Sequence, residues 1–305
     1  MNDKKDIKFN SINASSLFHF TKKKETLESI LSNGLRFSYA FESISPQITA
    51  NINYSSIPKK VVEGLLKETG IAIPMISFCD IPITRASLHM GRYGKYMIGF
   101  DKSHLTEWYK NTINPVLYIH SGNLSDAMVD LSEVYAETFK AQIESIVSLS
   151  KQGKTKESPE FKEQTTTLGL RKFFILFLYG LIKPVYDPKE DRFYYDEREW
   201  RAFLPDDSFF NDIWKWEITK ENYDSNRDSW NNYLAESPDN YITLYEDILR
   251  DAITHIVVSE ESEIDGVIKF VMESEKIFGY TNISKEARLY LVSRITSIER
   301  IALDY

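Results

Sequence analysis

A nearly continuous apolar run at residues 71–80 limits the fold more than any other feature of the chain. It reads Ile-Ala-Ile-Pro-Met-Ile-Ser-Phe-Cys-Asp, with no polar residue before Ser77. Such a run is typical of a strand that is buried on both faces. Pro74 and Pro82 are expected to mark its limits, because proline cannot donate to a strand ladder. The run therefore predicts a covered sheet.

The flanking segments alternate between strand and helix patterns. At 16–20 the residues alternate as in a strand, with Leu17 and His19 on one side. A helix is expected next, with Thr21 as its N-terminal cap and Gly34 at its C-terminal end. Further strands are expected at 35–37, 97–100, 116–120, 197–204 and 253–258, and further helices at 59–68, 102–110, 124–149, 167–182, 241–250 and 265–274. The segments 38–57 and 206–240 are expected to be irregular. This alternation favours an α+β or mixed α/β fold over a helical bundle.

The length and composition are those of an ordinary globular protein. With 305 residues, 42% of them hydrophobic, the chain has enough apolar material for a sizeable core. Residues 151–160 are polar and linker-like. We predict a single domain, residues 1–305, with a helical insertion at about 124–183.

Charge and cysteine content exclude several classes of site. Acidic residues outnumber basic ones by 45 to 37, so the net charge of -8 provides no general attraction to nucleic acid or to an anionic membrane. The single cysteine, Cys79, permits no internal disulfide and no cysteine-based zinc site, and no two histidines have zinc-helix spacing. No metal is predicted. The polar N-terminus and the lack of a long apolar run indicate neither a signal peptide nor a membrane span, so a cytoplasmic protein is expected.

The segment 194–201, Tyr-Tyr-Asp-Glu-Arg-Glu-Trp-Arg, is the main candidate for chemistry. On a strand, Glu197, Glu199 and Arg201 point to one side, and Arg198 and Trp200 to the other. Two carboxylates on one side are suited to acid/base work or to stabilising a developing positive charge. The alternative is an edge strand whose charges are solvated and partly neutralise each other. The segment alone leaves both readings open.

His19 and Cys79 are two further candidates for a site. His19 in its apolar strand is either a hydrogen-bonded core residue or part of a site. Cys79 with His89 or His19 has the components of a thiol nucleophile and base. However, no cysteine-protease signature surrounds it, and a lone cysteine is more often a small buried side chain.

Taken together and in order, these motifs resemble those of a known family. The chain resembles, over most of its length, the AbiGi family of bacterial abortive-infection (anti-phage) proteins. The motifs that carry the resemblance are His19-Phe20-Thr21, Asn33-Gly34-Leu35, Ser77-Phe78-Cys79-Asp80-Ile81-Pro82, Tyr93-Gly94-Lys95-Tyr96 and Glu197-Arg198-Glu199-Trp200-Arg201. That family is described as the antitoxin half of a two-gene phage-resistance system. The resemblance implies a partner toxin or antitoxin protein.

A more distant resemblance is to the ADP-ribosyltransferase-like fold, in which three short motifs on successive strands hold NAD. It implies a split mixed sheet with helical insertions. The first-strand motif falls on His19, the middle-strand serine on Ser77, and the Glu-x-Glu pair on Glu197 and Glu199. A His-type first motif usually accompanies a middle tyrosine and a lone glutamate, so the motifs here are mixed.

The same resemblance assigns roles to these residues, with NAD as a substrate. Glu199 holds the ribose hydroxyl and stabilises the oxocarbenium-like centre, and Glu197 positions or deprotonates the acceptor. His19 hydrogen-bonds an NAD ribose, Thr21 also belongs to the NAD-binding residues, and Ser77 orients the carboxylate site. An aromatic side chain stacks on nicotinamide, and the candidates for it are Tyr39 and Phe41.

Two functions from different classes therefore remain open. One is transfer of ADP-ribose from NAD to a protein or nucleic-acid acceptor. The other is a non-catalytic antitoxin that binds and neutralises a toxin, because such folds are also used as binding modules.

Overall fold

A computed structural model of the chain describes residues 14–43, 69–108, 113–120, 141–142, 144–155, 157–164, 166–167, 180–187, 191–204 and 215–304. Its strands are β1 (Ser16–Thr21), β2 (Leu35–Arg36), β3 (Ser38–Ser43), β4 (Thr69–Cys79), β5 (Tyr96–Asp101), β6 (Ile113–Pro115), β7 (Leu117–Ile119), β8 (Ile182–Pro184), β9 (Tyr186–Asp187), β10 (Arg192–Phe193), β11 (Glu199–Phe203), β12 (Lys215–Thr219), β13 (Tyr241–Ile242), β14 (Ile253–Val258), β15 (Lys276–Ile277), β16 (Tyr280–Thr281) and β17 (Ile295–Ser297). Its helices are α1 (Lys24–Asn33), α4 (Ser87–Tyr93), α5 (Lys102–Trp108), α8 (Lys220–Ala235), α9 (Glu246–Ala252), α10 (Ile264–Glu273), α11 (Lys285–Val292) and α12 (Ile298–Asp304), with 3-10 turns η2 (Ile83–Arg85), η3 (Tyr194–Glu197), η4 (Pro238–Asn240) and η5 (Glu261–Glu263).

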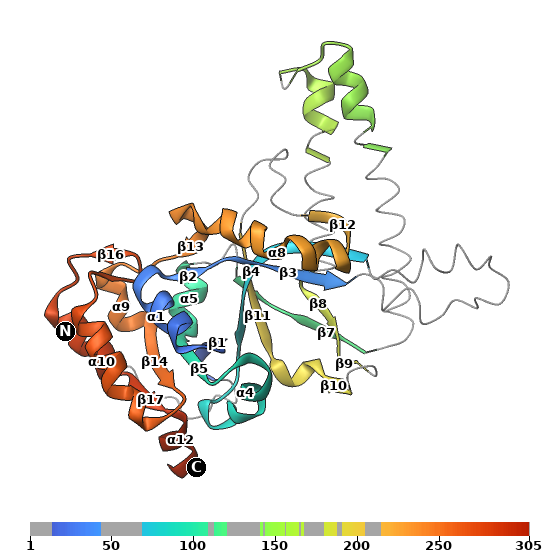
Figure 1. Ribbon diagram of the computed structural model, residues 1–305. Coiled ribbons are helices and arrows are strands. Elements are labelled where there is room, and N and C mark those ends of the chain that lie inside the picture. Colours follow the sequence, from blue (N-terminus) through green and yellow to red (C-terminus); the bar gives the residue numbers. More distant parts are fainter. Residues whose placement is uncertain are drawn as a thin grey trace, which may run out of the picture.

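A mixed sheet forms the centre of the molecule (Figure 1). Within the described residues its main path runs β17-β14-β5-β1-β4-β11-β6, and β3 and β12 also pair with β4. The pair β14 and β17 is parallel, whereas β1, β4, β5 and β11 pair in antiparallel fashion. The expectation of an α+β fold with a mixed sheet is confirmed.

The longest described strand is β4, which contains the apolar run. The predicted strand is confirmed, but Pro74 lies inside it and does not mark a limit. Tyr39 of β3 lies opposite Pro74 and donates its backbone N–H to Asn231 Oδ1 at 2.8 Å. The proline is tolerated because Tyr39 donates its N–H to α8 and not to Pro74, and because the carbonyl of Pro74 still accepts a hydrogen bond from the N–H of Leu204 at 3.0 Å.

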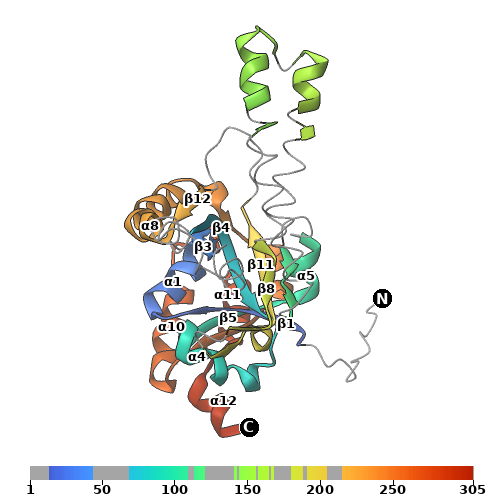
Figure 2. The ribbon, with the colours of Figure 1, turned by 90° about the vertical axis from the view of Figure 1, so that its right-hand side faces the viewer.

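Two apolar layers cover the two faces of the sheet. The larger layer includes Leu17, Phe78 and Phe100 from the strands, and helices α1, α8, α9, α10 and α11 pack against it. The smaller layer includes Phe18 and Cys79, and α4 and α12 pack against it. Neighbouring residues of β1 thus face opposite layers, as the strand alternation predicts. Figure 2 shows the helices around the sheet in a second view, turned by 90° from that of Figure 1.

The opening strand and helix are confirmed, but the predicted cap is wrong. The helix begins at Lys24 with Lys23 at the cap position, and no side chain caps it. Thr21 instead remains in β1, opposite Tyr96. Gly34 ends the helix with a φ of 95°, and a Cβ there would lie 2.4 Å from the carbonyl oxygen of Ile242.

Two polar segments carry more regular structure than expected, and one predicted helix begins later than expected. Residues 38–43 form β3 rather than a loop, because their backbone pairs with the apolar β4. The segment 206–240 contains β12 and the 16-residue helix α8, which begins where Thr219 accepts a hydrogen bond from the N–H of Asn222 at 3.2 Å. Only Tyr223 and Leu234 of this helix are buried, so its apolar periodicity is weak. Residues 241–242 form β13, and α9 begins only at Glu246.

The described part of the predicted insertion is largely helical. Residues 144–151 and 159–164 form two helices that stand away from the sheet in Figures 1 and 2, and Ile146 and Phe161 pack together between them. Ile182 and Lys183, at the predicted end of the insertion, belong to β8. The predicted helix at 59–68 and most of those at 124–149 and 167–182 lie outside the described residues. Among the helices that the structure describes, none combines the length and apolarity that a membrane span needs.

Candidate functional site

An interruption in the sheet exposes the middle of the Ser-Phe-Cys-Asp motif. On one edge of β4, β3 pairs as far as Met75, whereas β1 is paired with β4 at a single position, Phe18 opposite Cys79. Between these points a side chain takes the place of strand pairing on this edge of β4: His19 Nδ1 lies 2.9 Å from the carbonyl oxygen of Ser77. Since a carbonyl only accepts, Nδ1 carries the proton in this contact. The side chain of Ser77 is exposed at the interruption.

The Glu-x-Glu segment is not one continuous strand. Glu197 ends the 3-10 turn η3, Arg198 takes a left-handed conformation with a φ of 44°, and β11 begins at Glu199. The prediction that Glu197 lies on the strand is therefore wrong. From Glu199 onward the alternation holds: Glu199 and Arg201 lie opposite Cys79 and Ser77, and Trp200 faces the other way, packed against the larger apolar layer.

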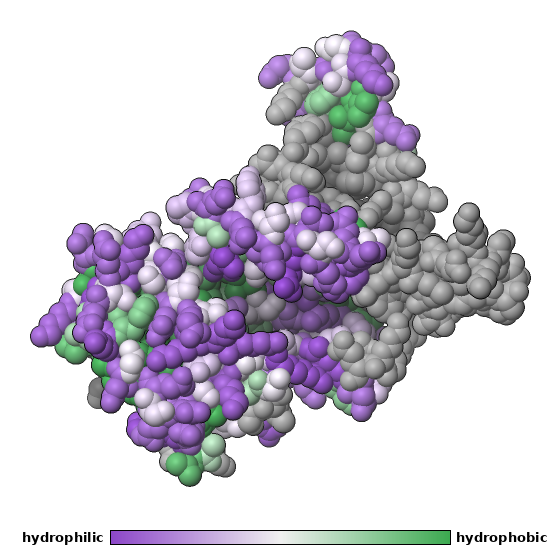
Figure 3. Space-filling view, viewed as in Figure 1, coloured by the Kyte–Doolittle hydropathy of each residue, from purple (hydrophilic) through white to green (hydrophobic). Residues whose placement is uncertain are grey.

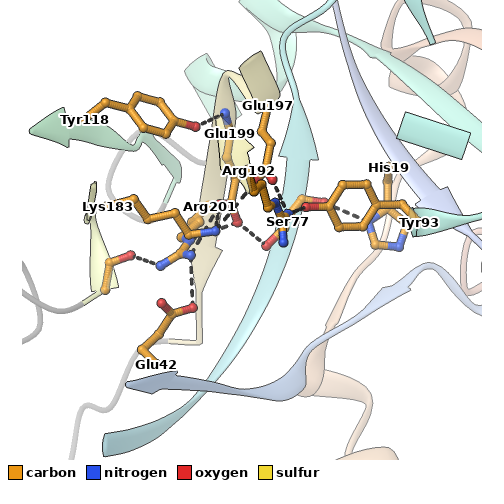
Figure 4. A network of polar contacts seen from close by, with 11 residues as sticks. His19, Glu42, Ser77, Tyr93, Tyr118, Lys183, Arg192, Glu197, Glu199 and Arg201 are labelled. Carbon is orange, nitrogen blue, oxygen red and sulfur yellow. Dashed lines mark hydrogen bonds and ion pairs between the residues drawn. The ribbon is translucent and has the colours of Figure 1, made fainter. Parts of the chain in front are cut away.

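Glu199 lies at the centre of a network of polar contacts (Figure 4). Its Oε1 accepts from Ser77 Oγ at 2.7 Å and from Arg201 Nε at 2.9 Å. Its Oε2 accepts from Lys183 Nζ at 2.7 Å and from Arg201 Nη2 at 3.3 Å. A carboxylate has about four lone-pair positions, so these donor atoms fill the acceptor capacity of Glu199.

Glu197 joins the same network from the preceding turn. Arg192 of β10 donates to its Oε1, and Lys183 Nζ lies 3.7 Å from its Oε2. Lys183 therefore bridges the two carboxylates of the Glu-x-Glu motif. Both glutamates point to the same cluster, as expected, although a turn and not strand alternation positions the first of them.

Arg201 connects the network to two further parts of the chain. Its side chain is 1% exposed, and it donates to the carbonyl oxygen of Gly180 and to Glu42 Oε1, the latter at 2.9 Å. We call Glu42, Lys183, Arg192, Glu197, Glu199 and Arg201 the ion cluster. It contains three carboxylates and three cations, so its formal charges cancel.

The ionisation of Glu199 follows from these neighbours. Burial alone would raise its pKa, but the charges and hydrogen bonds of Arg201 and Lys183 outweigh burial and hold the pKa well below its usual range. The same pairing raises the pKa of Arg201 despite its burial. Glu199 is therefore a stable anion at physiological pH, and its proton affinity is far from that of a general acid or base.

Two tyrosines border the ion cluster. Tyr93 of α4 accepts a hydrogen bond from Arg192, and Tyr118 of β7 accepts one from the backbone N–H of Glu199 at 2.8 Å. Burial, reinforced by the charge of Glu197, raises the pKa of Tyr93. Burial also raises the pKa of Tyr118. Both tyrosines are neutral at physiological pH and contribute hydrogen bonds at the border of the cluster.

Cys79 does not have the properties of a nucleophile. Its side chain is buried, and burial together with the charges of Glu199 and Glu197 raises the pKa of its thiol far above neutral pH. His19 lies on the opposite face of the sheet, against the ring of Phe78. Burial lowers the pKa of His19, although its bond to Ser77 opposes this. The geometry supports the view of Cys79 as a small core residue.

The structure brings together four of the residues that the sequence proposed for a site. Ser77 and Glu199 are hydrogen-bonded, Glu197 shares Lys183 with Glu199, and His19 binds the backbone of Ser77 from the other face.

The remaining three proposed residues lie elsewhere. Tyr39 and Phe41 are on the opposite face of the sheet from Glu199, where their rings pack against Trp230 and Tyr223 of α8 at 5.4 Å each. Thr21 pairs with β5 rather than with β4. Side-chain alternation along β3 accounts for the positions of Tyr39 and Phe41.

Several members of the cluster carried little signal in the sequence. Arg201 is two residues from Glu199 and was placed on the same side by alternation. Lys183 and Arg192 lie in strands of three and two residues, which are too short to show a period. Glu42 lies in the segment 38–57, for which the sequence predicts irregular structure. Tyr93 stands in the Tyr-Gly-Lys-Tyr motif, but nothing local indicates its bond to Arg192.

Comparison with known proteins points to one family. A family model with the description "Putative abortive phage resistance protein AbiGi, antitoxin" matches residues 48–241, a range that includes Ser77 and most of the ion cluster. No curated protein and no solved structure matches the chain. In the part of the chain that the structure describes, no group of three or more His, Cys, Asp or Glu residues is arranged to hold a metal ion.

Proposed function

This chain belongs to the AbiGi family of abortive phage resistance proteins, which are described as antitoxins, and on that premise we propose that it binds and neutralises a partner toxin in phage defence. Neutralisation by binding requires a stable surface and no reactive group. The toxin partner is expected to be the product of the second gene of a two-gene resistance system.

The saturation of Glu199 is the observation that carries this proposal. Its four acceptor positions are filled by Ser77, Lys183 and Arg201, and the charges of the ion cluster cancel. A catalytic carboxylate must gain interactions with the substrate as the transition state forms. Glu199 gains one only by giving up a bond it already has. The cluster is better suited to holding β4, β8, β10 and β11 in fixed positions.

The antitoxin proposal predicts that Glu199→Gln retains neutralisation. Glutamine preserves the shape of the side chain and one oxygen acceptor but removes its charge. The chain and its variant are co-expressed with the product of the second gene in cells in which that product alone arrests growth. We expect both to restore growth when immunoblots show equal amounts of each. Loss of rescue by a variant that remains folded and abundant would contradict the proposal.

A second candidate is transfer of ADP-ribose from NAD to a protein or nucleic-acid acceptor. It is favoured by the continuous contacts from His19 through the backbone and side chain of Ser77 to Glu199, beside an exposed Ser77. In this reaction Glu199 holds the ribose and stabilises the positive charge that develops as nicotinamide leaves, and Glu197 positions or deprotonates the acceptor. Neither Tyr39 nor Phe41 lies on the side of Glu199, so the nicotinamide ring would stack elsewhere.

Nicotinamide release separates the two candidates. Purified wild type and Glu199→Gln are incubated with NAD and cell extract, and free nicotinamide is measured by chromatography. The antitoxin proposal expects release no greater than in extract alone. Release by the wild type that Glu199→Gln lowers by ~100-fold or more would establish the transferase instead, since loss of an electrostatic contact made in the transition state has an effect of this size.

A further inference from the structure

Three aromatic side chains are exposed beside the ion cluster. Tyr186 of β9, Phe193 of β10 and Tyr195 of η3 are 37%, 57% and 56% exposed, and we call them the aromatic patch. The rings of Tyr186 and Phe193 pack on each other, with centroids 4.7 Å apart. Large aromatic side chains at the surface are enriched in protein interfaces, where they supply much of the binding energy.

The ion cluster holds the aromatic patch in place. Phe193 follows Arg192, which is bonded to both Glu197 and Tyr93. Tyr195 packs edge to face on Tyr118, whose hydroxyl accepts the N–H of Glu199. A surface fixed before binding loses little conformational entropy when a partner docks, so the saturated cluster favours binding here.

Two exposed carboxylates stand next to the aromatic patch in the sequence. Lys183 and Arg192 direct their charges inward to Glu197 and Glu199. Asp191 and Asp196, by contrast, are exposed and flank Phe193 and Tyr195 in sequence. The whole chain also carries a net charge of -8. A partner with an apolar anchor and a rim of Lys or Arg side chains complements this surface.

We propose that the aromatic patch is the surface on which the partner toxin docks, and that the toxin presents a basic rim around its apolar anchor. This inference rests on the proposed antitoxin function and names the surface that performs it. The patch lies within the residues matched by the AbiGi family model. By contrast, the face over α1, α8 and α10 in Figure 3 is largely hydrophilic.

The test measures the affinity of the chain for the product of the second gene. The variants are Phe193→Ser, Tyr195→Ser and Asp196→Lys, and each is expected to weaken binding by ~10-fold or more. Tyr245→Ser is the matched control: Tyr245 is 63% exposed and stacks on Tyr280 at 4.5 Å, but it lies beyond residue 241, outside the matched segment. Thermal unfolding checks that each variant is folded.

The possible outcomes separate the surface from the function. If the wild type binds and the patch variants bind as tightly as Tyr245→Ser, the surface assignment is wrong while the antitoxin function stands. If the wild type does not bind the product of the second gene, both proposals fail. Asp196→Lys removes no ring, so weaker binding by this variant tests the charge argument even if a serine variant unfolds.

Discussion

Two buried ion pairs near β4 lie on opposite faces of the sheet and differ in how completely they are satisfied. On one face, Glu199 fills its four acceptor positions with Ser77, Lys183 and Arg201, and all three side-chain nitrogens of Arg201 donate, to Glu199, Glu42 and Gly180. On the other, Lys102 donates to Asp80 Oδ2 and lies over the ring of Trp200, but Asp80 Oδ1 accepts no hydrogen bond from any described residue.

This difference indicates which pair fixes the structure. A buried charge is costly unless it is paired and hydrogen-bonded. Arg201 meets this condition with contacts to three segments of the chain, whereas Lys102 is 21% exposed and has water as an alternative partner. We therefore expect the stability of the fold to depend strongly on the ion cluster and weakly on the pair of Asp80 and Lys102.

The largest effect is expected for Arg201→Met. The substitution keeps most of the side-chain volume but leaves Glu199 and Glu42 without their shared cation, and it leaves the Gly180 carbonyl without its donor. Removing one member of a buried pair typically costs ~3–5 kcal/mol. Urea unfolding measures the loss.

The control for Arg201→Met is Arg300→Met. Arg300 pairs with Glu261 at the surface, and both side chains are 53% exposed. The expected loss is below ~1 kcal/mol. Equal losses in the two variants would show that burial of the cluster has no energetic consequence.

Glu199 is expected to make the free energy of unfolding depend on pH in acid, with an effect of intermediate size. Its pKa in the folded chain is below the usual value of 4.5, so the unfolded chain binds more protons as the pH falls. The stability that ionised Glu199 contributes is fully present above its usual pKa. It is lost as the pH falls from about 4.5 toward the folded pKa, by up to about 1.4 kcal/mol per pH unit. Glu199→Gln is therefore expected to unfold with a shallower pH dependence between about pH 3 and pH 5. An unchanged slope would mean that another group controls acid unfolding.

The free energy of unfolding is also expected to depend on pH through His89, in a different pH range. Burial lowers its pKa from 6.5, although the charge of Glu197 opposes this. Stability that depends on neutral His89 is complete above pH 6.5 and is lost as the pH falls below that value toward the folded pKa. We expect His89→Phe, which keeps the ring contacts with Phe20 and Tyr93, to reduce the slope of stability against pH below pH 6.5. Denaturant titrations at several pH values measure it.

The smallest effect is expected for Asp80→Asn. The change removes the charge that faces Lys102, but the lysine has access to solvent and the carboxylate was only partly satisfied. We expect a loss of about 1 kcal/mol. A loss as large as that of Arg201→Met would contradict the view that saturation of hydrogen bonds distinguishes the two pairs.

Sequence patterns predicted much of the fold where the apolar signal was strong. The run in β4, the alternation of β1 and β11 and the apolar periods of α1 and α10 were all readable, because each element has at least one buried face. Helix α8 and strand β3 were missed because their residues are mostly polar and their positions depend on packing against β4. The predicted helix at 59–68 lies outside the described residues and stays a prediction.

The Glu-x-Glu motif shows most clearly which features follow from the sequence and which depend on the tertiary structure. The sequence by itself placed Glu199 and Arg201 on one side of a strand and Trp200 on the other, because alternation is a local property of the backbone. Only the tertiary structure decided that Lys183 and Arg192 neutralise the two glutamates, that Ser77 fills the last acceptor position, and that β1 separates from β4 beside it. Ser77 and Glu199, for example, are 122 positions apart in the sequence. Such contacts depend on strand register and long-range packing, which no local period encodes.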